Sequence, residues 1–176
     1  ISYDIIDKQQ LVTLFDKNDL FISFNYSNTL EKVYKINSSN IVHLHGLAKK
    51  DYNEGEIIVG HGTKNPIIPK YKGESNTLSD LFAADVYEDN KKIFHDLYKD
   101  PSLHIPKLNP ITEQIHLCRK VTILGHSLSS VDAEYFHFIA RIIPAQTAIH
   151  IYYHNKNDLM KMRNAAKDLF PQHRKK

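Results

Sequence analysis

Short runs of β-branched and aromatic residues recur along the chain, separated by segments whose apolar positions have helical spacing. Runs of this length and composition predict β-strands. The predicted strands cover residues 20–24, 41–44, 57–59, 121–124 and 148–153. Because strands and helices alternate after residue 20, the pattern predicts an α/β fold with a mostly parallel sheet that helices cover on both faces.

The predicted helices are marked by apolar stripes and by the prolines and glycines that separate them. One helix is expected to begin at Asn28, because Asn28 and Glu31 have the spacing of a capping box. Two more are predicted over residues 77–98, with an interruption near residues 89–90, and over residues 111–118. Prolines and a glycine predict a loop at residues 64–76.

Two later helices are predicted from apolar residues that recur at helical spacing. The stripe of the first comprises Phe136, Ile139, Ala140 and Ile143. The stripe of the second comprises Leu159, Met162, Ala166 and Leu169. Both stripes are typical of helices that face a core.

Composition narrows the class of protein. A chain of 176 residues fits one domain, so residues 1–176 are predicted to form a single unit. Cys118 is the only cysteine, which excludes a disulfide framework. No apolar run approaches the ~20 residues of a membrane helix, and no signal peptide is visible. The net charge of +3 comes from lysines that mostly alternate with acidic residues. We therefore expect a cytoplasmic protein without a membrane or nucleic-acid partner.

Four of the six glycines adjoin a histidine, each directly after a predicted strand. They are Gly46 after His45, Gly60 and Gly62 around His61, and Gly125 before His126. Glycine at such a position permits positive φ or a close approach to a ligand, and histidine supplies a donor, a base or a metal ligand. Ligands of parallel sheets bind where the strands end, so we expect these three sites to converge. Tight turns that need no ligand are the alternative for each site.

Asn25 follows the first predicted strand, where its amide can donate and accept hydrogen bonds. Helix capping is the alternative role for this asparagine. His43 and His45 lie two apart on a strand and therefore face the same side, where they could bind a metal together. A metal site needs three or four ligands, and no motif completes this one. We predict no metal.

Small hydroxyl residues and an acidic residue follow the fourth predicted strand, at Ser127, Ser129, Ser130 and Asp132. Free backbone N–H groups at a helix start favour a phosphate or a ribose hydroxyl beside Ser127. Capping by Ser129 or Ser130 is the alternative that needs no ligand. A serine hydrolase is not favoured, because Ser129 stands where the nucleophile elbow has its second glycine.

In their order and spacing these segments resemble the AbiH family of bacterial abortive-infection proteins, which act against bacteriophage. The matching segments are residues 24–31, 42–46, 59–62 and 123–132, with Tyr135 and Phe136. The resemblance spans about residues 20–138. It implies a phage-defence protein, with a phage-derived trigger or a second copy of the chain as partner.

The same pattern is similar, more distantly, to sirtuin-like NAD-consuming domains, which implies a three-layer Rossmann-like fold and NAD as the substrate. Carried over by position, this resemblance implies that Asn25 contacts the nicotinamide ribose and that His45 is the base or a ribose-hydroxyl partner. Residues predicted to line the nucleotide site are Tyr26, Gly46, His61, Gly125, His126, Ser127 and Asp132. Ser27 stands where the related domains have an aspartate.

Related chains of both kinds open with a strand and a Gly-rich turn that cradles a pyrophosphate. Nothing before Leu20 contains a glycine, so this element is predicted to be missing from the sequence. The leading hypothesis is a phage-defence protein that cleaves NAD at the nicotinamide–ribose bond. The alternatives are a non-enzymatic module that senses a nucleotide or phage component, and a nuclease effector, although acidic residues and lysines do not cluster at strand ends.

Overall fold

The computed structural model describes residues 15–48, 57–60, 62, 78–153 and 156–173, and the following account concerns these residues. The chain divides into two compact units. The first unit comprises Ile1–Ile58 and His104–Leu117, and the second comprises Val59–Leu103 and Cys118–Lys176. The single-domain prediction and the missing amino-terminal element stay predictions.

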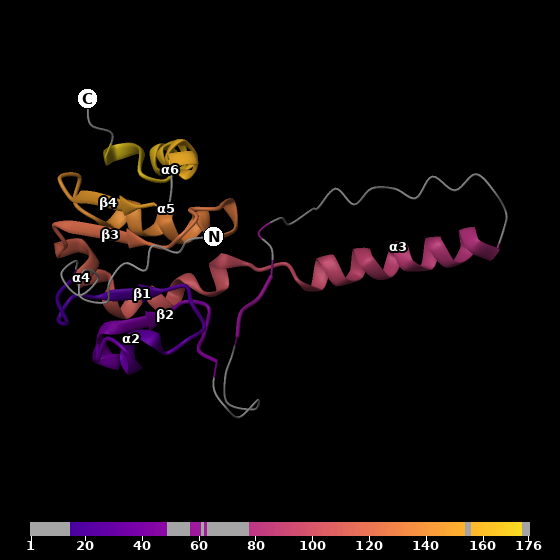
Figure 1. Ribbon diagram of the computed structural model, residues 1–176, viewed down its shortest axis with the longest axis horizontal. Coiled ribbons are helices and arrows are strands. Elements are labelled where there is room, and N and C mark those ends of the chain that lie inside the picture. Colours follow the sequence, from indigo (N-terminus) through magenta and orange to yellow (C-terminus); the bar gives the residue numbers. More distant parts are fainter. Residues whose placement is uncertain (1–14, 49–56, 61, 63–77, 154–155, 174–176) are drawn as a thin grey trace. The chain divides into compact units, whose positions relative to one another are not determined.

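The first unit is built on a pair of parallel strands. Strand β1 (Phe21–Ser23) pairs with β2 (Ile41–His43) in the register Phe21↔Ile41 to Ser23↔His43. The short helix α2 (Thr29–Lys32) and a 3-10 turn at Ser38–Asn40 connect the two strands (Figure 1). Helix α4 (Thr112–Leu117) follows a 3-10 segment at Ile105–Ile111. The buried apolar side chains of this unit are Ile36, Leu44, Ile58, Leu108, Ile111 and Ile115.

The second unit contains another parallel pair. Strand β3 (Lys120–Leu124) pairs with β4 (Ala148–Tyr152), from Lys120↔Ala148 to Leu124↔Tyr152. Helix α5 (Ala133–Ile142) connects the two strands and contacts α6 (Lys156–Leu169) (Figure 1). Helix α3 (Leu78–Asp96) also belongs to this unit. The buried apolar side chains are Ile123, Leu128, Tyr135, Phe136, Ile139, Ala140, Ile143, Leu169 and Phe170.

The apolar stripe predicted for α5 is confirmed, since all four of its residues are buried in the second unit. In the last helix only part of the stripe is buried: Leu169 is buried, whereas Leu159 is exposed. Four predicted strands and the parallel direction of their pairing are confirmed. The described strands form two separate two-stranded sheets. An α/β class is therefore shown, and the three-layer Rossmann-like arrangement stays a prediction.

Three local predictions are wrong. Residues 57–60 form no strand; instead the backbone N–H of Ile58 donates to the carbonyl of His45 at 2.9 Å. Helix α3 continues through residues 89–90 without interruption, because single Asp and Asn residues inside a helix lower its stability only slightly. Asn28 is the N-cap residue of α2 but makes no side-chain cap, and Glu31 contacts His43 instead of closing a capping box. The loop predicted at 64–76 lies outside the described residues.

None of the helices in the described part of the chain combines the length and the apolar character needed to cross a bilayer.

Candidate functional site

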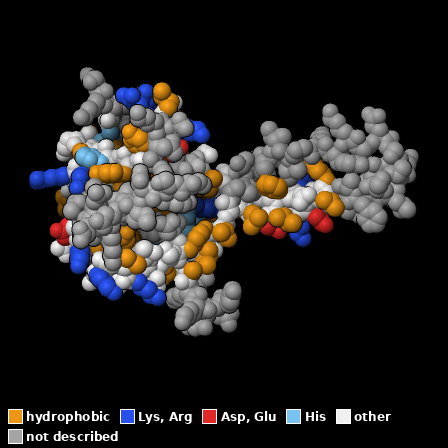
Figure 2. Space-filling view, in the orientation of Figure 1, with side chains coloured by type: hydrophobic (Ala, Val, Ile, Leu, Met, Phe, Trp, Pro, Cys, Tyr) orange, Lys and Arg blue, Asp and Glu red, His pale blue; other side chains and the backbone are white. Residues whose placement is uncertain are grey.

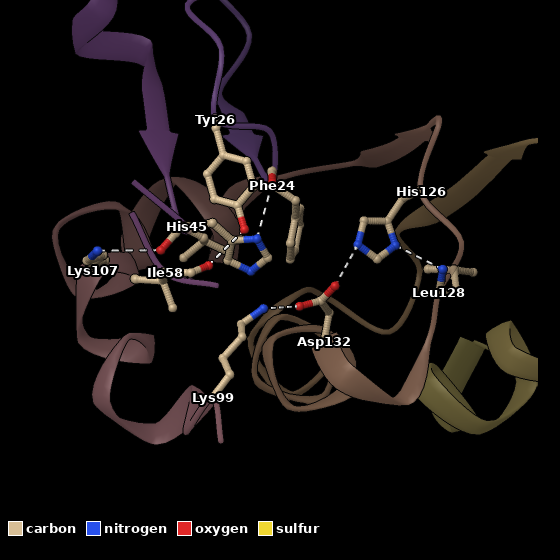
Figure 3. A network of polar contacts seen from close by, with 10 residues as sticks. Phe24, Tyr26, His45, Ile58, Lys99, Lys107, His126, Leu128 and Asp132 are labelled. Carbon is tan, nitrogen blue, oxygen red and sulfur yellow. Dashed lines mark hydrogen bonds and ion pairs between the residues drawn. The ribbon is translucent and has the colours of Figure 1, made fainter. Parts of the chain in front are cut away.

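His45 is a buried histidine directly after β2, and only 6% of its surface is exposed. Its ring packs edge-on against Phe24 with 5.3 Å between the centroids, and its Nδ1 lies 3.1 Å from the Phe24 carbonyl oxygen (Figure 3). A carbonyl can only accept, so Nδ1 must carry the proton of this hydrogen bond. In the neutral ring the lone pair then belongs to Nε2. The main chain that follows β1 thus selects the tautomer of the histidine that follows β2.

The loop after β1 is held by its own hydroxyl group. The buried Ser23 hydroxyl accepts from the backbone N–H of Asn25 at 3.2 Å and donates to the Asn25 carbonyl at 3.3 Å. The Asn25 side chain is exposed. Because the backbone rather than the amide is fixed in this way, the Asn25 side chain stays available to a ligand. Asn25 does not cap α2, whose N-cap residue is Asn28, and its binding role stays a prediction.

Tyr26 and Gly46 shape the same loop pair. The Tyr26 hydroxyl donates to the Ile58 carbonyl at 2.8 Å, and the Tyr26 carbonyl accepts from the N–H of Ala48 at 2.7 Å. The Tyr26 ring lies 6.2 Å from the His45 ring between centroids. Gly46 has φ of +82° in a turn closed by its N–H and the His43 carbonyl, a conformation that favours glycine. Both residues therefore have clear structural roles in holding the His45 loop.

Glu31 and His43 form a pair that the sequence interpretation did not connect. Glu31 Oε1 lies 2.8 Å from His43 Nε2, and the two side chains are 22% and 14% exposed. The second carboxylate oxygen and Nδ1 are buried without a hydrogen-bond partner in the described structure. His43 and His45 thus have different partners, and no three metal-ligating side chains gather within the described residues. The pair ties α2 to the end of β2.

The second unit carries a charge cluster centred on Asp132. Lys99 Nζ lies 2.5 Å from Asp132 Oδ1, and His126 Nε2 lies 3.3 Å from Asp132 Oδ2 (Figure 3). The lysine side chain is only 3% exposed and the aspartate 13%. The ammonium also lies 5.4 Å from the centroid of the Tyr135 ring. Burial, followed by the charge of Asp132, raises the pKa of Tyr135 above its usual value of 10.

His126 closes the turn after β3. Its Nδ1 accepts the backbone N–H of Leu128 at 2.9 Å, so the ring proton resides on Nε2 and points to Asp132. Leu128 has a positive φ of +53°, which this bond helps to hold. Both ring nitrogens are therefore engaged within the protein. His126 therefore orients the loop, and the Ser127 side chain of the same loop is exposed to solvent.

The serine cap, the alternative that needs no ligand, is not formed. Ser129 precedes a 3-10 turn at Ser130–Asp132 without a side-chain cap, and Asp132 is itself the N-cap residue of α5, again without one. The Asp132 carboxylate binds Lys99 and His126 rather than helix N–H groups. Its predicted place in the nucleotide site stays a prediction, and its observed contacts are with side chains of the protein itself.

The glycines near Lys99 permit close backbone packing. A Cβ on Gly60, whose φ is +150°, would lie 2.2 Å from the Leu97 carbonyl oxygen, and one on Gly62 would lie 2.6 Å from Val131 Cα. Gly125 has φ of +62° with open space where a Cβ would be. Gly60 and Gly62 therefore serve contact between segments, whereas Gly125 serves a turn. His61 lies outside the described residues.

The predicted site residues fall into two groups. Asn25, Tyr26, His45 and Gly46 lie together in the first unit. Gly125, His126, Ser127 and Asp132 lie together in the second unit. The convergence of the two groups on one hollow stays a prediction. Lys99 was missed because it has no local motif and meets Asp132 only through the fold, 33 residues along the chain.

The architecture is that of an α/β protein whose polar loops follow parallel strands. Residues 2–153 match the family model described as bacteriophage abortive infection AbiH. The chain therefore belongs to the AbiH family, and the family resemblance is confirmed. No curated protein and no solved structure matches the chain. The family points to abortive-infection defence, while the sirtuin-like similarity is not shown.

Proposed function

We propose that this AbiH-family chain acts in phage defence by binding a nucleotide at the loops that follow its parallel strands, and that it cleaves NAD at the nicotinamide–ribose bond. In this proposal His45 is the general base and Asn25 positions the ribose. Loops at the carboxyl ends of parallel strands are the usual ligand sites of α/β folds.

The observation that carries the proposal is the hydrogen bond from His45 Nδ1 to the Phe24 carbonyl. A histidine whose Nδ1–H is held by an acceptor presents the basic lone pair at Nε2 in its neutral form. Burial and the edge-on contact with Phe24 restrict the ring to one orientation. The neighbouring Asn25 amide is exposed and can accept or donate to a ribose hydroxyl.

The proposed reaction is a hydrolysis that needs only water as co-reactant. The bond between the ribose C1′ and the nicotinamide nitrogen breaks, and its electron pair leaves with the neutral nicotinamide. Water forms the new bond to C1′, and the proton that it releases goes to Nε2 of His45. General base catalysis of this type contributes about 10²–10⁴ in rate.

A nucleotide sensor without catalysis is the second candidate. The observation that favours it is His126, whose two ring nitrogens have protein partners, so the loop after β3 offers binding groups but no base. On this hypothesis the chain binds a nucleotide and does not consume it.

The test is incubation of the purified chain with NAD, with release of nicotinamide measured by chromatography and binding measured by calorimetry. We expect release from the wild-type chain and its loss in His45→Gln and Asn25→Ala. His137→Gln, which changes an exposed histidine on α5, serves as the matched control and should release nicotinamide normally. Binding without release would favour the sensor. Release that persists in both variants would remove these residues from the active site.

A further inference from the structure

Glu31 and His43 form a mostly buried acid–histidine pair in the first unit, with 2.8 Å between Glu31 Oε1 and His43 Nε2. Charged side chains of the described residues are otherwise mostly exposed, and Figure 2 shows lysine, arginine and acidic side chains on the surface of one face. In this pair one carboxylate oxygen and one ring nitrogen are buried without a hydrogen-bond partner in the described structure. A buried pair of this kind adds little to stability, because both groups lose their hydration. Stability alone therefore does not account for it.

The loop that carries Asn25 is held at both of its ends by neighbouring residues of the strand pair. At its start, the Ser23 hydroxyl accepts from the Asn25 N–H and donates to the Asn25 carbonyl. At its end the chain enters α2, whose Glu31 contacts His43. Ser23 and His43 are partners in the register of β1 and β2, so their side chains lie on the same face of the strand pair. The contact between Glu31 and His43 therefore closes the Asn25 loop onto the strands.

Helix α2 needs such a contact to keep its position. It has four residues, too few for a helix to be stable by itself, and its N-cap residue Asn28 makes no side-chain cap. None of its residues is buried, so packing contributes little to its placement. The hydrogen bond from His43 to Glu31 supplies a directional contact instead. It fixes α2, and with it the end of the Asn25 loop, against β2.

His43 also holds the turn that carries His45. The His43 carbonyl accepts from the N–H of Gly46 at 3.3 Å and closes this turn. The His45 ring in turn bonds to the carbonyl of Phe24, the residue before Asn25. A displacement of His43 would therefore reach both the proposed base and the residue proposed to position the ribose.

We propose that the Glu31–His43 pair positions the two proposed catalytic groups: its hydrogen bond holds the loops of Asn25 and His45 in the arrangement that nicotinamide release requires. This inference rests on the proposed function. Glu31 and His43 act through Asn25 and His45 and do not themselves contact the nucleotide. Misplacement of reacting groups by about 1 Å lowers a rate by about 10²-fold, which sets the size of the expected effect.

The first test compares the rate of nicotinamide release from NAD in variants of the full chain. Glu31→Ala should lower kcat by about 10²-fold. Glu31→Gln should retain most of the rate, because its amide oxygen still accepts the hydrogen bond from Nε2. Glu113→Gln changes an exposed glutamate on α4 of the same unit and serves as the matched control with an unchanged rate. An unchanged rate in Glu31→Ala, or equal losses in Glu31→Ala and Glu31→Gln, would overturn the proposal.

A double variant separates positioning from stability. Glu31→Leu/His43→Leu removes the pair without leaving either polar group alone, so it should unfold at about the urea concentration of the wild type. It should still lose the rate that Glu31→Ala loses. Release at the wild-type rate from this double variant would overturn the proposal.

Nitrogen-15 spectra of the histidine rings test the positioning without NAD. A carboxylate only accepts, so His43 should show the proton on Nε2, whereas His45 should show it on Nδ1. In Glu31→Ala the His45 signals should change to those of a tautomer mixture, because the Phe24 carbonyl is no longer held opposite Nδ1. His43→Gln and His45→Gln assign the signals. An unchanged His45 tautomer in folded Glu31→Ala would overturn the proposal whatever the rates.

The two arms distinguish failure of this inference from failure of the proposed function. If the wild-type chain releases no nicotinamide, the proposed function fails, and the His45 spectra alone decide whether Glu31 and His43 position the loop. Circular dichroism checks that the variants are folded. If Glu31→Ala does not fold, the spectra are recorded on Glu31→Leu/His43→Leu, where the same change of the His45 signals is expected and its absence would overturn the proposal.

Discussion

The loops after β2 and after β3 both contain a histidine beside a glycine with positive φ, yet their histidines are used in opposite ways. In the first unit His45 donates Nδ1–H to a carbonyl, which leaves the basic lone pair on Nε2. In the second unit His126 accepts a backbone N–H at Nδ1 and directs Nε2–H to Asp132. Two similar sequence motifs therefore hold opposite tautomers, and the proposed role of His45 as a base requires the tautomer that it has. The main-chain group opposite Nδ1 makes the difference.

The largest effect is expected from exchanging the two histidines for glutamine in turn. His45→Gln should lower nicotinamide release by about 10²–10⁴, because Gln can still donate to the Phe24 carbonyl but has no basic nitrogen. His126→Gln should instead lower the melting temperature and leave the rate nearly unchanged. Single-turnover rates and thermal unfolding of both variants check this. Equal losses of rate in the two variants would contradict the proposed difference between the roles of His45 and His126.

The next largest effect concerns the support of the His126 loop. Lys99→Met should destabilise the protein by about 3–5 kcal/mol, because it leaves the Asp132 carboxylate buried without its nearest cation. Lys91→Met removes a lysine from an exposed ion pair and should cost under about 1 kcal/mol. Urea unfolding gives both values. The double variant Lys99→Met/Asp132→Leu leaves no buried charge without a partner, so it should regain part of the lost stability. A loss of stability equal to the sum of the two single changes would contradict this account.

Glycine substitutions separate packing from turn formation in the second unit. Gly60→Ala should cost about 1–3 kcal/mol, since its Cβ meets the Leu97 backbone and the conformation is unfavourable for alanine. Gly125→Ala meets open space and should cost only about 1 kcal/mol, from its positive φ alone. Denaturant unfolding compares them directly. A larger loss of stability in Gly125→Ala than in Gly60→Ala would contradict this account.

The smallest effect is a pH dependence from Tyr135. Its pKa is raised in the folded protein, so above pH 10 the unfolded chain loses this proton while the folded chain keeps it. Stability should be complete below pH 10 and should fall as the pH rises further. Tyr135→Phe should flatten this fall. Unfolding in urea between pH 9 and 11 measures this fall in stability. If the fall is the same in Tyr135→Phe as in the wild type, Tyr135 is not its source.

Local sequence patterns were sufficient for several elements. The stripe of Phe136, Ile139, Ala140 and Ile143 predicts α5 correctly, because a helix with apolar residues at this spacing buries one face. The apolar run at 57–59 predicts a strand wrongly, because a strand also needs a neighbour in register and Ile58 bonds to the His45 loop instead. Glu31 has the spacing of a capping-box residue, but its carboxylate contacts His43 instead.

By itself the sequence determined the family, the positions of four strands and the loops that carry the predicted site residues, because these depend on short-range periodicity and motif order. Only the tertiary structure decided what each loop residue contacts. Lys99 contacts Asp132, Glu31 contacts His43, and the Phe24 carbonyl accepts a hydrogen bond from His45 Nδ1. Each of these contacts joins residues that are at least 12 positions apart in the chain. Tautomer, charge pairing and burial arise from such contacts, and no local pattern encodes them.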